Sequence, residues 1–305
     1  MGRVAYFNGK IVPENEAKVS IWDAGFQVGQ TVFETERTFN HKIFELSIHL
    51  DRLWRSAKYA AIDIGLSKQE LKDATEQVLQ QNLHLIGPDE EYWVYQHITG
   101  GLFNFFHSAE LEESKATVII NCFPVAFDYY SKFYSQGAHL VIPSIRLSPP
   151  VCQDPKMKCR SRINYHLADL QAKQSDPDAY CLMLDTQGNV AENRGANFFM
   201  VRDGALWTPT TRNVLEGVCR SKVIELAKQI GRPVYERDLQ LYDVYNADEA
   251  FLTSTSFCIL PVSKIDHASI GNRVPGPVTQ DLLDSWSREV GVDIVGQAVG
   301  LARNK

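Results

Sequence analysis

A lysine and a glutamate, 34 residues apart in the chain, are the two side chains on which chemistry can be built. Lys158 lies in a loop that contains Pro and Cys, and Glu192 lies among small and amide residues. A lysine amine forms a Schiff base with an aldehyde. A carboxylate beside a pyridinium nitrogen keeps that ring protonated, so the ring can accept electrons. A pyridoxal phosphate (PLP) site requires this pair of groups. A lysine and a glutamate that are ordinary surface charges would look the same in the sequence.

Three further stretches contain groups that bind phosphate. Arg52 lies in a predicted helix, where its guanidinium can fork onto phosphate oxygens. Gly217 precedes another predicted helix, so the N–H groups of Val218 and Cys219 lie at its positive end. The run of residues 252–256 closes a predicted strand with four hydroxyl residues. Caps and turns use the same residues, and only their occurrence together with a lysine and a glutamate favours a cofactor site.

The bulk composition is that of an ordinary globular protein of two domains or one large one. The chain has 305 residues, of which 44% are hydrophobic and 22% charged, with a formal net charge of −6 and no long run of one sign. This argues against a nucleic-acid or membrane-surface protein. The six cysteines show no CxxC spacing, so we expect no metal site and a reducing compartment. With no signal-peptide pattern and no bilayer-length apolar run, we expect a cytoplasmic protein.

The predicted elements fall into two domains. Residues 1–126 read as a small mixed α+β domain of strands and two helices. Residues 127–305 read as a larger domain in which strands alternate with helices, the last of them over 278–290. We place the boundary near residue 126, in a connection rich in aromatic residues. The predicted fold class is therefore α+β or α/β with two domains.

Local signals indicate where several N-terminal elements begin and turn. Asn8-Gly9, flanked by alternating apolar residues, predicts a β-hairpin. Ser47 is a candidate cap for the helix that carries Arg52. Ser67, followed three residues later by Glu70, predicts a second helix that begins with a capping box.

Taken together, the residues resemble the fold-type IV (class IV) PLP enzymes. This family includes branched-chain aminotransferases, D-amino-acid aminotransferases, aminodeoxychorismate lyases and (R)-selective amine transaminases. In the N-terminal part the resemblance is carried by YFNGKIVP, AKVSIWDAGFQVGQTVFETER and HLDRLWRSAK. In the C-terminal part it is carried by NYHLADLQA, CLMLDTQGNVAENRGANFF, LWTPTTRNVLEGVCRSKVIELAKQIG, NADEAFLTSTSFCILPV and GPVTQDLL. It implies a D-amino-acid aminotransferase-like fold, PLP as cofactor and a homodimer.

The resemblance also implies a role for each matching residue. Lys158 would form the Schiff base and move a proton between substrate and cofactor. Glu192 would pair with the pyridine nitrogen. The remaining implied cofactor-binding residues are Arg52 at the phosphate, Tyr165 near the ring hydroxyl, Asn197 behind the glutamate segment, and Val218, Cys219, Thr255 and Ser256 around the phosphate.

The lysine departs from the family pattern in one respect. In branched-chain aminotransferases the lysine precedes the Asn-Tyr pair by four residues, whereas Lys158 precedes Asn164 by six. The 34-residue spacing to Glu192 matches that family. Two alternatives stay open: Lys156 is the Schiff-base lysine, or the lysine is lost and Arg160 fills its place.

On the substrate side, the resemblance places Val28 and Phe33 in the pocket. Gln96 and Gly100 stand where two branches of the family carry carboxylate-binding arginines, and the absence of arginine at 100 argues against a D-amino-acid substrate. Arg194 stands where small residues are usual. It is either a carboxylate-binding group or part of a structural ion pair.

The resemblance favours a transaminase that moves an amino group from an amino acid, of branched-chain type, to a 2-oxo acid. A D-amino-acid or (R)-amine transaminase, a lyase of the aminodeoxychorismate type and a non-catalytic PLP-fold protein are the alternatives. The aromatic run over residues 103–107 is either a cover for the pocket or a hydrophobic surface loop.

Overall fold

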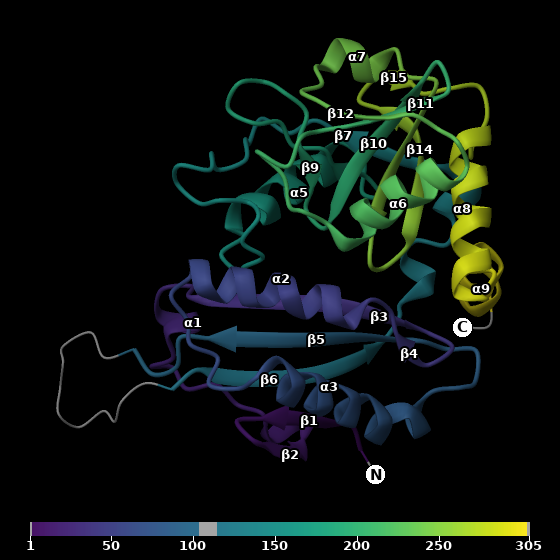
Figure 1. Ribbon diagram of the computed structural model, residues 1–305. Coiled ribbons are helices and arrows are strands. Elements are labelled where there is room, and N and C mark those ends of the chain that lie inside the picture. The colour runs from purple at the N-terminus through teal and green to yellow at the C-terminus, as the bar shows by residue number, and fades with distance from the viewer. Residues whose placement is uncertain (1, 104–114, 304–305) are drawn as a thin grey trace. The chain divides into compact units, whose positions relative to one another are not determined.

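The computed structural model describes residues 2–103 and 115–303, which form two compact units (Figure 1). The N-terminal unit comprises Met1–Val125 and Met157–Ser161, and the C-terminal unit comprises Ala126–Lys156 and Arg162–Lys305. The predicted boundary is a single break near residue 126, with everything after it in the second domain. The structure instead returns five residues, Met157–Ser161, to the N-terminal unit.

This returning segment pairs with the edge of one strand of the N-terminal sheet, the strand over Thr31–Phe39. The backbone N–H of Phe33 donates to the carbonyl of Lys158 (3.0 Å), and that of Arg160 donates to the carbonyl of Thr31 (2.9 Å). A segment that pairs with a strand edge satisfies backbone groups that burial would otherwise leave unpaired. The chain therefore carries the predicted lysine on the N-terminal unit.

The N-terminal unit is built on an antiparallel sheet with the strand order β2-β1-β6-β5-β3-β4. Its strands are β1 (Val4–Phe7), β2 (Lys10–Pro13), β3 (Thr31–Phe39), β4 (Lys42–Ile43), β5 (Tyr92–Thr99) and β6 (Thr117–Pro124). Its helices are α1 (Ala24–Gln27), α2 (Leu46–Tyr59) and α3 (Lys68–Asn82), with 3-10 turns η1 (Glu14–Glu16) and η2 (Leu83–Leu85).

Helices α2 and α3 bury their apolar sides against one face of this sheet. Leu50 and Leu53 of α2 share one hydrophobic core with Leu71 of α3 and with Val94 and Ile98 of β5. Alternate residues of a strand point to opposite faces. Even-numbered residues of β5 therefore face the helices, and the odd-numbered ones face the other side of the sheet.

The local predictions for this unit are confirmed in two cases and wrong in one. Asn8 and Gly9 form the turn between β1 and β2, both with positive φ, and Ser67 with Glu70 forms the capping box of α3. The helix α2, however, begins at Leu46, one residue before the expected cap Ser47. Packing of the buried Leu46 into the core extends the helix past the residue that local sequence favours as its cap.

The C-terminal unit contains a nine-stranded sheet with the path β12-β11-β10-β13-β14-β7-β8, to which β9 and β15 add at β10 and β14. Its strands are β7 (Ala138–Val141), β8 (Tyr180–Cys181), β9 (Glu192–Asn193), β10 (Ala196–Arg202), β11 (Ala205–Thr208), β12 (Val234–Glu236), β13 (Glu249–Ser254), β14 (Cys258–Ile265) and β15 (Ala268–Ser269). Its helices are α4 (Phe133–Gln136), α5 (Ile163–Ser175), α6 (Val218–Gln229), α7 (Leu241–Tyr245), α8 (Pro277–Val290) and α9 (Ile294–Arg303), with the 3-10 turn η3 (Phe127–Tyr129).

The central strands of this sheet are buried on both faces, and their aromatic residues pack across them. Phe199 of β10 stacks on Phe251 of β13, with ring centroids 5.1 Å apart. The strand β13 ends at Ser254, and β9 adds Glu192 beside Asn197 of β10. The sheet thus places Glu192 of β9, Asn197 of β10 and the end of β13 side by side.

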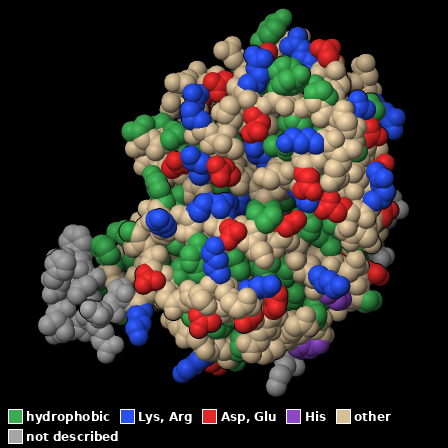
Figure 2. Space-filling model, viewed as in Figure 1, with side chains coloured by type: hydrophobic (Ala, Val, Ile, Leu, Met, Phe, Trp, Pro, Cys, Tyr) green, Lys and Arg blue, Asp and Glu red, His purple; other side chains and the backbone are tan. Residues whose placement is uncertain are grey.

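The face of the molecule in Figure 2 shows Lys and Arg side chains interspersed with Asp and Glu, in keeping with the modest net charge. None of the helices within residues 2–103 and 115–303 has the length and apolar character needed to cross a bilayer.

Candidate active site

Lys158 lies on the sheet face of the N-terminal unit that the helices leave uncovered. In the segment that pairs with β3, Cys159 stands opposite Val32 and joins the helix-covered core. Its neighbours Lys158 and Arg160 must therefore point to the other face. There the Lys158 Nζ lies 4.7 Å from the centroid of the Phe33 ring, and the Arg160 Cζ lies 3.6 Å from it. The lysine is thus held beside an aromatic surface.

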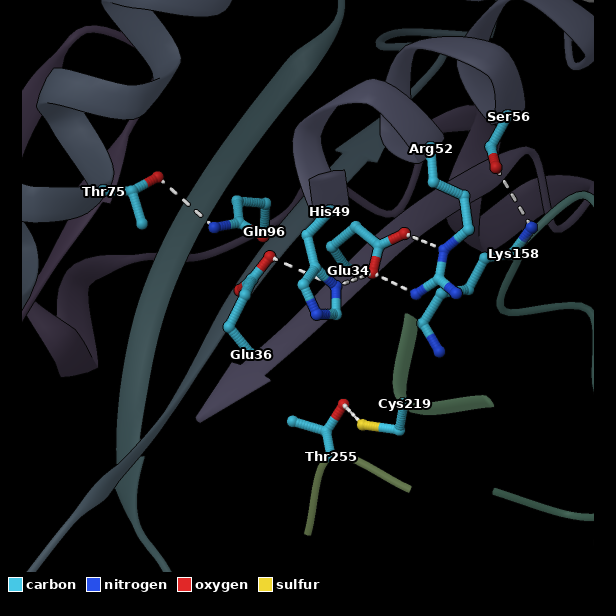
Figure 3. A network of polar contacts seen from close by, with 10 residues as sticks. All are labelled: Glu34, Glu36, His49, Arg52, Ser56, Thr75, Gln96, Lys158, Cys219 and Thr255. Carbon is cyan, nitrogen blue, oxygen red and sulfur yellow. Dashed lines mark hydrogen bonds and ion pairs between the residues drawn. The ribbon is translucent and has the colours of Figure 1, made fainter. Parts of the chain in front are cut away.

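A serine of α2 holds the backbone of this lysine. The Lys158 N–H donates to the Ser56 Oγ at 3.1 Å (Figure 3). The rival Lys156, described within the C-terminal unit, is exposed, and its Nζ lies 3.5 Å from Asp154 Oδ2. Of the two lysines, Lys158 has its backbone tied to the sheet and to α2, and this favours it as the site of Schiff-base chemistry.

Arg52 of α2 forms a two-pronged ion pair with Glu34 of β3. Its Nε donates to Glu34 Oε1 at 2.7 Å and its Nη2 donates to Oε2 at 2.6 Å, and both side chains are buried (Figure 3). The Nδ1 of His49 lies 2.8 Å from the same Oε2. Burial opposes ionisation of Glu34, but the Arg52 charge and the hydrogen bonds outweigh burial and hold the pKa of Glu34 well below its usual range.

Glu36 lies two residues further along the same strand, on the same helix-covered face. It is 0% exposed, and neither of its carboxylate oxygens has a hydrogen-bond partner among the described residues. Glu34, Glu36 and His49 can bring one ligand atom each within 4.8 Å of one another. Burial, reinforced by the Glu34 charge, raises the pKa of Glu36 well above its usual value. Burial therefore favours the neutral form of Glu36, and Arg52 already neutralises Glu34.

Glu192 has its carboxylate fixed by three donors within the C-terminal unit. The Tyr165 hydroxyl donates to Oε1 at 2.9 Å, and the Asn197 Nδ2 and the Leu215 N–H donate to Oε2 at 3.0 and 2.9 Å. The residue is only 4% exposed. Hydrogen bonds to a carboxylate favour its charged form. The strand pairing of β9 with β10 thus presents a buried, oriented carboxyl group.

The start of α6 lies beside this carboxylate network. Gly217 is the N-cap of α6, and it has no side chain that could accept from the first turn. A Cβ at this position would lie 2.0 Å from the Asn197 Oδ1, so only glycine fits. The prediction that a helix starts after Gly217 is confirmed. The N–H groups of Val218 and Cys219 are the first of α6, where the helix dipole favours an anion.

The strand β13 brings the predicted hydroxyl residues to the same helix start. The Cys219 Sγ lies 4.0 Å from the Thr255 Oγ1 (Figure 3). The Ser256 N–H donates to the Ser254 Oγ at 3.2 Å, and its carbonyl accepts from the Tyr130 hydroxyl at 2.8 Å. Within the C-terminal unit, the structure therefore brings Cys219 of α6 together with Thr255.

The predicted substrate residues occupy different surroundings. Phe33 lies under Lys158, and Val28 is exposed just after α1. Gln96 points the other way, into the helix-covered core, where its Nε2 donates to the Thr75 Oγ1 at 3.3 Å. This position does not favour a role for Gln96 at the Lys158 face.

Arg194 is half-exposed, and its Nη1 lies 3.6 Å from the Asp169 Oδ2, as in a structural ion pair. Most of the aromatic run over residues 103–107 lies outside the described residues.

Two residues that the sequence analysis did not select share the face with Phe33. The rings of His97 and Tyr95 stack with centroids 5.8 Å apart, and His97 stacks on Phe33 at 6.4 Å. Arg160 Nη2 lies 3.3 Å from His97 Nδ1. Alternation along β5 puts Tyr95 and His97 on one face, but their place beside Phe33 follows from the pairing register, in which Phe33 stands opposite His97.

Comparison with known proteins identifies a match along most of the chain. The family model described as "Amino-transferase class IV" matches residues 31–265. A putative branched-chain-amino-acid aminotransferase of Methanocaldococcus jannaschii is 35% identical over 92% of this chain and 94% of its own length. A D-alanine aminotransferase of Listeria monocytogenes is 28% identical over 93% and 94%. The branched-chain amino acid aminotransferase of Thermobaculum terrenum, solved in its PLP-form, superposes with a TM-score of 0.82 at 27% identity, over 97% of this chain and 95% of its own.

Proposed function

Because this chain belongs to the class IV aminotransferase family, we propose that it moves an amino group between a branched-chain amino acid and a 2-oxo acid with PLP as cofactor. The observation that supports this proposal best is the position of Lys158. Its backbone is paired with β3, and its amine lies over the Phe33 ring. An amine held in this way can bind the cofactor aldehyde without a long search through rotamers.

The residue types and their surroundings fit PLP. The buried Glu192 offers a carboxylate for the pyridine nitrogen, and the donors from Tyr165, Asn197 and Leu215 orient it. Gly217 begins α6 without a capping side chain, and the positive end of a helix favours a phosphate. Arg52 supplies a guanidinium whose position is set by Glu34. When bound, PLP supplies the electron sink for the reaction.

The protein's own groups would then divide the work. Lys158 would hold the cofactor through its aldehyde and would serve as the base and acid for the substrate Cα proton. Glu192 would pair with the ring nitrogen. We propose that Arg52, with the N–H groups of Val218 and Cys219 and the hydroxyls of Thr255 and Ser256, anchors the phosphate, so that the reacting atoms stay in register.

The test is covalent trapping of the lysine. We expect the purified protein with PLP to show a lysine-bound cofactor absorbance, which borohydride reduction fixes onto the peptide that contains Lys158. Lys158→Ala should abolish both signals, whereas Lys156→Ala should keep them. Label on Lys156, or on neither lysine, contradicts the assignment.

The relatives also support a second candidate, D-alanine transamination. A half-reaction screen decides between the candidates, with L-leucine, L-valine and D-alanine tested for conversion of bound PLP to its amine form. Release of pyruvate without any 2-oxo acid acceptor would indicate a lyase instead. Bound cofactor that no amine converts would indicate a non-catalytic protein.

We also propose a homodimer in the cytoplasm. Five of the six cysteines are buried free thiols and the sixth is an exposed one, which favours a reducing compartment. The proposal of a dimer rests on the family resemblance. Light scattering on the protein as it elutes from a size-exclusion column tests this proposal. A monomer that retains full activity would contradict it.

A further inference from the structure

We propose that Arg160 binds the substrate carboxylate, on the same aromatic surface that carries Lys158. The inference rests on the proposed function and adds to it the residue that selects amino acids over simple amines. The sequence alone suggested for Arg160 only a role as a replacement for the lysine.

The backbone places the two cations side by side. Lys158 and Arg160 are separated by one residue in a segment that pairs with β3, so their side chains leave the same face about 7 Å apart along the strand. Both lie over one ring, that of Phe33, at 4.7 Å for the amine and 3.6 Å for the guanidinium carbon. The amine and the guanidinium therefore contact the same aromatic ring.

The guanidinium is oriented by its surroundings although the residue is exposed. Its plane is attracted to the face of Phe33, as expected for a cation over an aromatic ring. Its Nη2 lies 3.3 Å from the His97 Nδ1, and His97 is itself stacked between Tyr95 and Phe33. Arginine held in this way loses less side-chain freedom when it binds a ligand.

His97 can accept a hydrogen bond from Arg160 because it is neutral. Burial, and then the Arg160 charge, lower the pKa of His97 to about 4, against which a hydrogen bond with Asn121 acts in the other direction. At neutral pH the imidazole therefore carries no charge that would repel the guanidinium. Arg160 remains the fixed positive charge of this cluster of Phe33, Tyr95, His97 and Arg160.

The chemistry of the substrate matches this pair of cations. An α-amino acid carries its amine and its carboxylate on one carbon, so a residue that recognises the carboxylate must lie close to the lysine that the amine replaces. A guanidinium binds a carboxylate through two parallel hydrogen bonds, which lysine cannot do. The two positions where branches of the family carry such an arginine hold Gln96, which faces the core, and Gly100. Arg160 supplies the charge from the lysine segment instead.

The first experiment compares a substrate with and without its carboxylate. Wild-type holoenzyme, Arg160→Gln and Arg160→Lys are mixed with L-leucine or with 3-methylbutylamine, and conversion of the bound cofactor is followed by absorbance. In Arg160→Gln we expect the half-saturating concentration of leucine to rise about 10- to 100-fold, with little change for the amine. The half-saturating concentration of leucine for Arg160→Lys should lie between those of wild type and Arg160→Gln. Lysine keeps the positive charge but cannot form the two parallel hydrogen bonds.

A binding measurement gives a readout that does not depend on turnover. The holoenzyme is titrated with 4-methylvaleric acid, a carboxylate without an amine, and with its neutral amide. We expect Arg160→Gln to weaken binding of the acid about 10- to 100-fold and to leave the amide unchanged. Arg202→Gln, which removes an exposed arginine next to the β10–β11 turn, is the matched control and should bind both as the wild type does.

The outcomes separate this inference from the proposed function. If wild-type holoenzyme converts no amino acid, the proposed function fails. If it converts leucine while Arg160→Gln and Arg160→Lys bind the acid as tightly as wild type, the inference is overturned. Should Arg160→Gln not retain cofactor, Arg160→Lys decides, and unchanged affinity for the acid in that variant counts against the inference.

Discussion

Arg52 and Glu34 meet in a buried two-pronged ion pair, with Nε–Oε1 at 2.7 Å and Nη2–Oε2 at 2.6 Å. The strand β3 supplies the acid and the helix α2 the base, so the pair ties the helix to the sheet. His49, one turn earlier on α2, contacts the same carboxylate. The guanidinium is therefore held in a defined orientation by the protein itself.

Loss of the acid in this pair should be costly. We expect Glu34→Gln to lower the free energy of unfolding of the cofactor-free protein by about 3–5 kcal/mol, because the Arg52 charge is left buried without its partner. Added PLP should restore part of this stability if Arg52 binds phosphate. Urea unfolding with and without PLP measures both effects. Glu14→Gln, in the more exposed pair with Arg3, is the control and should cost less than about 1 kcal/mol.

Replacement of Glu36 should raise the free energy of unfolding, in contrast to replacement of Glu34. The pKa of Glu36 is raised in the folded protein, so the folded state must keep a proton that the unfolded chain releases above about pH 4.5. Stability from this group is therefore lost as the pH rises above that value. Glu36→Gln, which is neutral at every pH, should be more stable than wild type, and the difference should grow between pH 5 and pH 8. A difference that stays constant over this range would show that Glu36 is ionised in the folded protein.

The hydroxyl of Tyr165 should matter for cofactor affinity. Tyr165→Phe removes one of the three donors to Glu192, and a hydrogen bond to a charged group contributes about 1.5–3 kcal/mol. We expect PLP to bind about 10- to 100-fold more weakly, as measured by equilibrium dialysis. Tyr92→Phe, which removes a buried hydroxyl bonded to the Asn82 carbonyl, should leave PLP affinity unchanged. Equal losses in both variants would mean that the effect is on folding.

A side chain at Gly217 should be destabilising because it would clash with Asn197, although the backbone conformation of Gly217 suits other residues. Its φ of −68° suits alanine, but the added Cβ would displace Asn197 and with it a donor to Glu192. We expect Gly217→Ala to lose about 1–3 kcal/mol of unfolding free energy and to bind PLP more weakly. Gly300→Ala, in α9 with nothing near the added Cβ, should be neutral or gain up to about 1 kcal/mol. Normal PLP affinity in Gly217→Ala would show that the Asn197 contact is dispensable.

Much of the fold could be predicted where a residue acts through its own backbone. Asn8 and Gly9 adopt the positive φ that a tight hairpin needs, and Gly217 starts a helix that follows it directly. The two-domain α+β class followed from the order of strands and helices. The roles of Lys158 and Glu192 came from the family resemblance, and they remain predictions that trapping and mutation must test.

Features set by packing or by register could not be predicted in the same way. The start of α2 at Leu46 depends on a core contact, and local capping preferences pointed one residue later. Tyr95 and His97 share the Phe33 face because of how β3 and β5 pair, and strand pairing is not visible in single-strand patterns. The helix over residues 278–290 was expected to be the last one, whereas a further helix, α9, follows it.

The return of Met157–Ser161 to the N-terminal unit means that the chain passes from one unit to the other three times. A fragment that ends near residue 126 would lack Lys158 and leave the β3 edge exposed, whereas the complementary fragment would carry Lys158 without the Phe33 ring beneath it. Recombination of this protein with its relatives at the first junction alone would therefore pair one parent's lysine with the other parent's aromatic surface. Chimaeras that exchange residues 157–161 together with the N-terminal unit should keep the two matched.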